Sequence, residues 1–117
     1  MSRARKRVAN RLLGYPDDAR LLLINADDLG MYQAINEAIV RAFREGIVHS
    51  TSLMVPCPGG SQAIELLRKD PDIRFGVHLS IIRDIGHYHW DPLTPKEKVP
   101  SLLDADGNLY GLGQMSE

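Results

Sequence analysis

The feature that most constrains the fold is a nearly uninterrupted apolar run at residues 21–26, which ends in the acidic pair Asp27-Asp28. Apolar residues that do not alternate with polar ones are typical of a strand buried on both faces of a parallel sheet. Parallel strands must be joined by a crossover segment, which is usually a helix. The run therefore predicts the first strand of an α/β domain.

The sequence up to about residue 82 alternates between helix and strand patterns. Residues 31–45 carry apolar side chains at helical spacing, polar residues such as Asn36 lie mostly outside this stripe, and Gly46 is a natural helix stop. The pattern then predicts a strand, a helix that Ser61 caps and a third strand, at residues 50–55, 62–69 and 74–79. The order β-α-β-α-β predicts a parallel sheet with right-handed crossovers.

The 117 residues are enough for one domain with a modest core. Residues 1–13 hold five basic and no acidic side chains and predict a flexible, solvated lead-in, with a nucleic-acid arm or a transit peptide as alternatives. Residues 14–117 form the predicted partial α/β domain. Its last part, residues 83–117, is rich in proline and glycine without periodicity, which indicates a long functional loop or a chain cut before its next element.

The overall composition argues against nucleic acid and membrane partners. The formal net charge of -1 gives no global attraction to polyanions, and no apolar run approaches the roughly 20 residues that a membrane span needs. The single cysteine, Cys57, cannot form an internal disulfide, so a reducing compartment and a cytoplasmic location are expected. Cys57 lies between two prolines without a catalytic motif, which favours a structural role.

Two acids and a histidine fall where active sites of parallel α/β proteins lie, at the carboxyl ends of strands. Asp27 and Asp28 end the first predicted strand, and His78 lies at the end of the third. One carboxylate can bind a cation, its neighbour can accept a proton, and an imidazole adds a nitrogen ligand; this mixture fits zinc, manganese or a similar ion better than calcium. The alternatives are an acidic pair that only caps the next helix and a histidine that only packs in the core.

Other polar residues near the predicted strands are weaker candidates. Thr51 and Ser52 lie too early in the second strand to count as part of its carboxyl end. His87 and His89 form an H-x-H pair that could chelate a metal, but an ordinary loop is the preferred interpretation of this spacing. His49 precedes the second strand without a partner in view and is interpreted as structural.

Several segments of the sequence resemble the YdjC-like carbohydrate deacetylases. The matching residues include N-A-D-D-L-G at 25–30 and G-V-H-L at 76–79. All matching segments follow one another in order and at compatible spacing, at residues 25–30, 36–38, 46–48, 50–58, 76–79, 87–93 and 98–107. The resemblance runs from about residue 13 to about residue 111, nearly the whole chain, and is therefore specific.

The resemblance implies an incomplete (β/α) barrel related to the polysaccharide deacetylases, of which this chain would be the amino-terminal part. It implies a hydrolase that removes acetyl groups from N-acetylated sugars with a divalent metal ion, magnesium or zinc. Asp28 and His78 would be metal ligands, and Asp27 would be the general base that activates the metal-held water. The implied partner is a small carbohydrate substrate.

The sequence departs from the family pattern in two ways. The family motif S-H-x-D-x-H, which supplies another histidine ligand, is absent, and residues 81–86 differ from an expected threonine-rich stretch. The family members are also much longer. The chain is therefore expected to expose sheet edges and apolar helix faces, and to self-associate or to need a missing carboxyl-terminal segment.

Two other functions stay open. A truncated, non-catalytic remnant would fold only with a partner or with the missing segment. A receiver-type signalling domain also begins with a strand that ends in a magnesium-binding acidic pair, but it needs an acceptor aspartate where this chain has His78.

Overall fold

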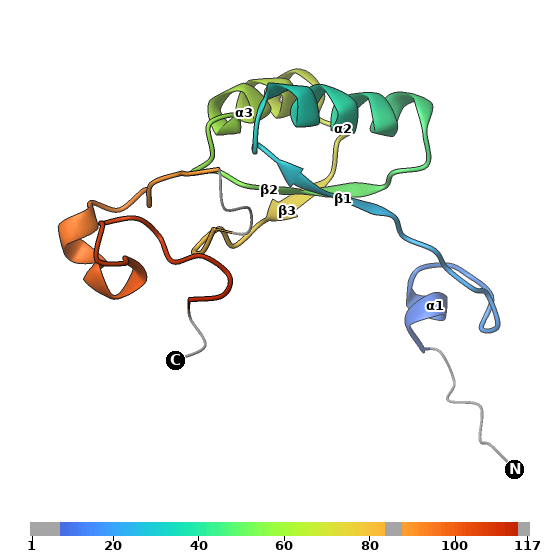
Figure 1. Ribbon diagram of the computed structural model, residues 1–117. Coiled ribbons are helices and arrows are strands. Elements are labelled where there is room, and N and C mark those ends of the chain that lie inside the picture. The colour runs from blue at the N-terminus through green and yellow to red at the C-terminus, as the bar shows by residue number, and fades with distance from the viewer. Residues whose placement is uncertain (1–7, 84–87, 115–117) are drawn as a thin grey trace, which may run out of the picture.

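The computed structural model describes residues 8–83 and 88–114 and contains a three-stranded parallel sheet. The sheet order is β1-β2-β3, with strands at Asn25–Leu29, Ser50–Leu53 and Phe75–Val77. Two helices connect the strands, α2 at Gln33–Glu45 and α3 at Gly60–Lys69. Both helices lie on the same side of the sheet (Figure 1). The predicted α/β fold and its β-α-β-α-β order are confirmed.

Three shorter helical segments lie outside this unit: the α-helix α1 and the 3-10 helices η1 and η2, at Val8–Leu12, Lys96–Lys98 and Pro100–Leu102. Residues 1–7 of the predicted basic lead-in lie outside the described residues. The Asn10 amide in α1 donates to the Ala19 carbonyl over 2.8 Å, which ties α1 to the segment that follows it. Within the described ranges, no helix is long and apolar enough to cross a membrane.

A core of apolar side chains holds both helices against one face of the sheet. Its buried members are Leu29, Ile39, Leu53 and Ala63. Because side chains alternate along a strand, Leu53 points toward the helices and Ser52 points to the opposite face. In the described chain, helices therefore cover one face of the sheet, and polar side chains occupy the other.

The predicted burial of the first strand on both faces is wrong. The strand β1 begins at Asn25 and not at residue 21, and Leu22 and Leu23 are 76% and 70% exposed. Backbone pairing between β1 and β2 also starts at Asn25. An apolar run becomes a strand only where a neighbour pairs with its backbone and packs on its side chains. The Ile24 carbonyl accepts from the His49 N–H and Asn25 pairs with Ser50, but residues 21–23 have no such partner among the described residues.

The helix ends follow the sequence signals only in part. Gly46 ends α2 as predicted, and its N–H donates to the Ala42 carbonyl over 3.1 Å. Ser61 does not cap α3, because the helix already begins at Gly60, and Gly59 occupies the N-cap position without a side-chain bond. A Cβ at Gly59 would lie 2.7 Å from the Tyr32 Cα, so the loops before α2 and α3 approach closely only because this residue is glycine.

Part of the predicted loop at residues 83–117 shares a small second core with the loops that follow β1 and β2. Trp90 and Leu109 pack with Met31, Met54 and Cys57, which lie in the loops that follow β1 and β2. Those loops leave the sheet at the carboxyl ends of its strands. Residues 88–114 therefore border the edge of the sheet at which the candidate site was predicted.

The Arg83 side chain holds this segment together. Its Nε donates to the Leu109 carbonyl over 2.5 Å, and its Nη2 contacts the Asp104 carboxylate over 3.2 Å. The side chains of Arg83 and Asp104 are only 11% and 13% exposed. Non-local contacts, which leave no periodic pattern in the sequence, thus fix the geometry of the segment.

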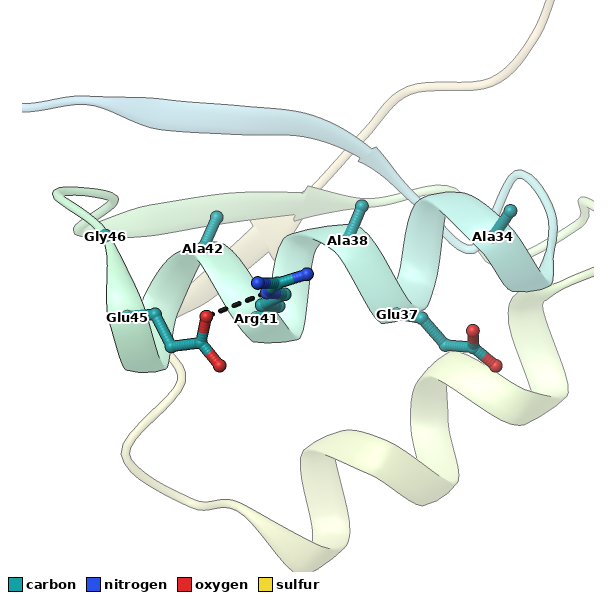
Figure 2. A pocket seen from close by; sticks show the side chains of 7 residues that line it. All are labelled: Ala34, Glu37, Ala38, Arg41, Ala42, Glu45 and Gly46. Carbon is teal, nitrogen blue, oxygen red and sulfur yellow. Dashed lines mark hydrogen bonds and ion pairs between the residues drawn. The ribbon is translucent and has the colours of Figure 1, made fainter.

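The uncovered surfaces expected of a partial barrel are present. The radius of gyration is 18.6 Å, whereas a compact domain of this length has roughly 13 Å. In the described residues β1 and β3 are both edge strands. One flank of α2 forms a shallow hollow lined by Ala34, Ala38 and Ala42, beside the ion pair of Arg41 and Glu45 (Figure 2).

Candidate active site

A row of hydrogen-bonded polar side chains crosses the face of the sheet opposite the helices. The Ser50 hydroxyl donates to Asn25 Oδ1 over 2.5 Å, and Asn25 Nδ2 donates to Asp27 Oδ1 over 2.6 Å. The Ser52 hydroxyl donates to the same Asp27 oxygen over 2.7 Å and lies 3.2 Å from His78 Nδ1. The row joins β1 to β2 and ends at His78, the residue directly after β3.

An irregularity in β1 brings both acids to this site. Ala26 pairs with Thr51 and Leu29 pairs with Leu53, so β1 carries one extra residue between the two pairs. Such a bulge re-aims side chains that would otherwise point to opposite faces. Asp28 has a φ of +69°, in the left-handed region that aspartate adopts more readily than most residues. The bulge explains why two consecutive acids can serve one site.

Asp28 and His78 converge in a way that suits a shared cation. Asp28 Oδ1 and His78 Nδ1 are 3.5 Å apart, and their side chains are 36% and 26% exposed. Two ligands at about 2.1 Å from one tetrahedral ion would be roughly 3.4 Å apart. Across residues 8–83 and 88–114, no group of three or more His, Cys, Asp or Glu side chains could hold a metal. The residues present therefore fit two positions of a metal site.

The structure bears on both alternatives to a metal site. The N-cap of α2 is Tyr32, which makes no side-chain cap bond, so neither Asp27 nor Asp28 is the cap residue of this helix. His78 is partly exposed and is not a member of the apolar core. Its backbone N–H donates to the Leu53 carbonyl over 3.0 Å, which anchors the residue beside β2.

The remaining polar candidates have different roles. Ser52 was predicted to lie too early in its strand, and that prediction is wrong, because Ser52 pairs with Gly76 and reaches both Asp27 and His78. The missing signal is the strand register, which no local pattern reveals. His49 Nδ1 accepts a 3.5 Å hydrogen bond from a backbone N–H, in accord with a structural role.

The H-x-H pair contributes little to a metal site in the described chain. His89 Nδ1 lies 2.9 Å from the Arg83 guanidinium, whose positive charge disfavours a second cation at that nitrogen. His87 lies outside the described residues. The interpretation of this pair as part of a loop remains the simpler one.

Cys57 is buried in the loop that follows β2. Burial raises the pKa of its thiol to about 11, and the negative charge of Asp28 adds to the effect. The thiolate is the nucleophilic form of cysteine, so a thiol with this pKa is inert near neutral pH. The predicted structural role of Cys57 fits this environment.

We expect the Cys57 thiol to react with iodoacetamide at pH 8 at least about 100-fold more slowly in the folded chain than in the unfolded chain. The pKa moves from 9.0 to about 11 on folding, which lowers the thiolate fraction by about that factor before steric protection is counted. Mass spectrometry of samples alkylated with and without guanidinium gives the ratio. Equal rates would contradict the burial of Cys57.

An apolar pocket of about 280 Å³ opens beside His78. Aliphatic side chains from the β2 and β3 ends and from the following segment form most of its wall, including Val55, Val77, Leu79 and Leu102. This wall gives the candidate site an apolar border on the side of His78.

Comparisons with known proteins agree on one family. A model of the YdjC-like proteins matches residues 21–117. A carbohydrate deacetylase of Thermoanaerobacter pseudethanolicus is 35% identical over 88 residues, which are 75% of this chain and 33% of that protein. A chitooligosaccharide deacetylase of Yersinia enterocolitica is 38% identical over 90 residues, which are 77% of this chain and 32% of that protein.

The fold also matches a solved structure. A crystal structure of an Enterococcus faecalis protein, proposed to cleave cellobiose phosphate, superposes with a TM-score of 0.69 at 33% identity. The match covers 79% of this chain and 34% of that one. The chain thus spans about a third of the length of the relatives it matches. With a family model that matches most of its residues, the chain belongs to the YdjC-like family.

Proposed function

We propose that the protein is a metal-dependent hydrolase that removes acetyl groups from N-acetylated sugars, and that Asp27, Asp28 and His78 carry the chemistry. The observation that carries this proposal is the 3.5 Å approach of Asp28 Oδ1 to His78 Nδ1, with Asp27 linked to His78 through Ser52. The deacetylases among the relatives support the choice of reaction. Oligosaccharides of N-acetylglucosamine are the first substrates to try, because one relative is a chitooligosaccharide deacetylase.

In this proposal, Asp28 and His78 hold a divalent ion, zinc or magnesium. When bound, such an ion polarises the acetyl carbonyl and lowers the pKa of a water molecule. Asp27 accepts one proton of that water, and the electron pair of the broken O–H bond forms the new bond to the carbonyl carbon. The C–N bond then breaks, and the amine nitrogen takes up the proton, which yields acetate and an amino sugar.

The apolar pocket beside His78 supports the same reaction. Its aliphatic wall suits the methyl group of an acetyl substituent, which needs an apolar environment and no hydrogen bonds. A polar row on one side of the site and an aliphatic wall on the other would orient the amide between them.

A further protein ligand would come from sequence outside these 117 residues. The family's S-H-x-D-x-H motif is the expected source, since the chain spans about a third of its relatives' length. The presence of two ligand positions and the open shape of the chain favour a second candidate function, in which the 117 residues alone are a non-catalytic part. A cytoplasmic location stays a prediction from the single cysteine.

The test is acetate release from N-acetylglucosamine oligomers by the protein in the longest form that its gene encodes. We expect acetate to form, the rate to vanish after chelation with EDTA, and zinc or magnesium to restore it. Asp72→Asn is the control, because Asp72 is exposed in the turn before β3, whereas His78 follows the other end of that strand. A rate that chelation leaves unchanged, or no acetate from any N-acetylated sugar, would reject the proposal. The same assay on the 117 residues alone separates the two candidate functions.

A further inference from the structure

The carboxylate of Asp27 is held by one of its two oxygens. Asn25 Nδ2 and the Ser52 hydroxyl both donate to Oδ1, over 2.6 and 2.7 Å. Among the described residues, no hydrogen bond to Oδ2 occurs. Two donors on one oxygen fix the plane of the carboxylate and leave the second oxygen free to meet a proton donor.

The direction of every hydrogen bond in this row follows from the carboxylate. An ionised carboxylate only accepts, so Asn25 must present its Nδ2 to Asp27 and its Oδ1 to the Ser50 hydroxyl. The same argument assigns the single hydroxyl proton of Ser52 to Asp27. Ser52 therefore has no proton left for His78 Nδ1, 3.2 Å away, so a hydrogen bond between these two atoms would be donated by the imidazole, and a cation bound at Nδ1 would take the place of that proton.

We propose that Ser52 and Asn25 are positioning residues that hold Asp27 by Oδ1, so that Oδ2 is the oxygen that takes the proton from the attacking water. The inference rests on the proposed function of Asp27 as the general base. It assigns a role to two side chains, one from β1 and one from β2, to which the proposed function gives none. Ser50 acts on Asp27 only indirectly, because its hydroxyl donates to Asn25 Oδ1 and so orients the Asn25 amide.

The test compares kcat and KM of the Ser52→Ala and Ser52→Thr variants with those of the wild type. All three proteins are made in the longest form that the gene encodes. Loss of the hydroxyl frees the Asp27 carboxylate to rotate, and we expect kcat to fall about 10- to 100-fold with KM changed less than about threefold. Threonine keeps the hydroxyl and is well tolerated in strands, so Ser52→Thr should recover kcat to within about threefold of the wild type.

Zinc affinity and a matched serine distinguish positioning from structural damage. Calorimetry should give zinc dissociation constants for Ser52→Ala and the wild type that agree within about threefold, since the Ser52 hydroxyl donates its proton to Asp27 and to neither of the two proposed ligands. Ser61→Ala, which removes an exposed serine that caps nothing, should leave kcat unchanged.

Three outcomes would overturn the inference while the proposed function stands. In each, the wild type releases acetate. The first is a Ser52→Ala kcat within threefold of the wild type, the second is a parallel loss of zinc affinity, and the third is a Ser52→Thr variant as slow as Ser52→Ala. A wild type that releases no acetate rejects the proposed function itself and removes the basis of the inference.

Discussion

Replacing Asp28 with glycine, or His78 with alanine, should weaken zinc binding by about 100-fold or more. Each change removes one of the two side chains whose oxygen and nitrogen approach to 3.5 Å. Even residues that only support metal ligands typically contribute 10- to 100-fold to affinity, so the loss of a ligand should reach at least that size. Glycine is the better replacement for Asp28, because alanine at a φ of +69° would add backbone strain of its own.

Calorimetric titration with zinc and with magnesium measures this effect, and Asp27→Asn is the control. Asparagine keeps the shape of Asp27 and removes the base, so zinc affinity should stay within about fivefold while acetate release is lost. An Asp27→Asn variant that binds zinc as poorly as Asp28→Gly would make Asp27 a ligand and reject its role as the base. Binding unchanged in Asp28→Gly or His78→Ala would reject the metal site.

The same zinc titration on the 117 residues alone distinguishes the two candidate functions. Micromolar zinc binding that both variants lose would mean that these three strands already assemble a metal site. No saturable binding, in a chain whose longer form does bind, would mean that the site needs a ligand from sequence outside these residues. The second result would favour a non-catalytic part of a larger enzyme, in accord with the two ligand positions in the described residues.

The order of elements could be predicted because its signals are local. The apolar stripe of α2, the glycine at its end and the short strand patterns each depend on residues that are close in sequence. The placement of Asp28 and His78 near each other followed from the same order, because carboxyl ends of parallel strands meet at one edge.

The features that the sequence did not reveal depend on non-local contacts. The bulge at Asp27-Asp28 is visible only once β1 and β2 are aligned, and the same alignment brings Ser52 to the site. The late start of β1 reflects the absence of a backbone pairing partner for residues 21–23 among the described residues. Residues 88–114 have no periodic pattern, yet Arg83 and Trp90 give them a defined shape.

Asn36 is the clearest case of a residue whose role the helical pattern hides. It lies mostly outside the apolar stripe of α2, where polar residues are usually solvated, but its side chain is completely buried. Its Oδ1 accepts from the Gly30 N–H over 2.6 Å, and its Nδ2 donates to the Gly59 carbonyl over 3.0 Å and to Gln62 Oε1 over 2.8 Å. One amide thus joins the loop after β1 to the start of α3.

Asn36→Ala should lower the free energy of unfolding by about 3 kcal/mol, because it orphans the buried Gly30 N–H and removes one of the two hydrogen bonds to the Gly59 carbonyl, which still accepts from the Ala63 N–H. Urea unfolding of the protein in the longest form that its gene encodes measures the change. Gln33→Ala is the matched control: Gln33 is an exposed amide on the same helix with one bond, to Glu37, and its loss should cost less than about 0.5 kcal/mol.

The same substitution connects stability to the site. Gly30 lies directly after the bulge that aims Asp28, so a loosened Gly30 backbone should also misplace the carboxylate and weaken zinc binding in the folded protein. A variant that loses stability but keeps full zinc affinity would confine Asn36 to a structural role. A variant as stable as Gln33→Ala would contradict the buried hydrogen bonds themselves, because an orphaned backbone N–H in the interior cannot be neutral.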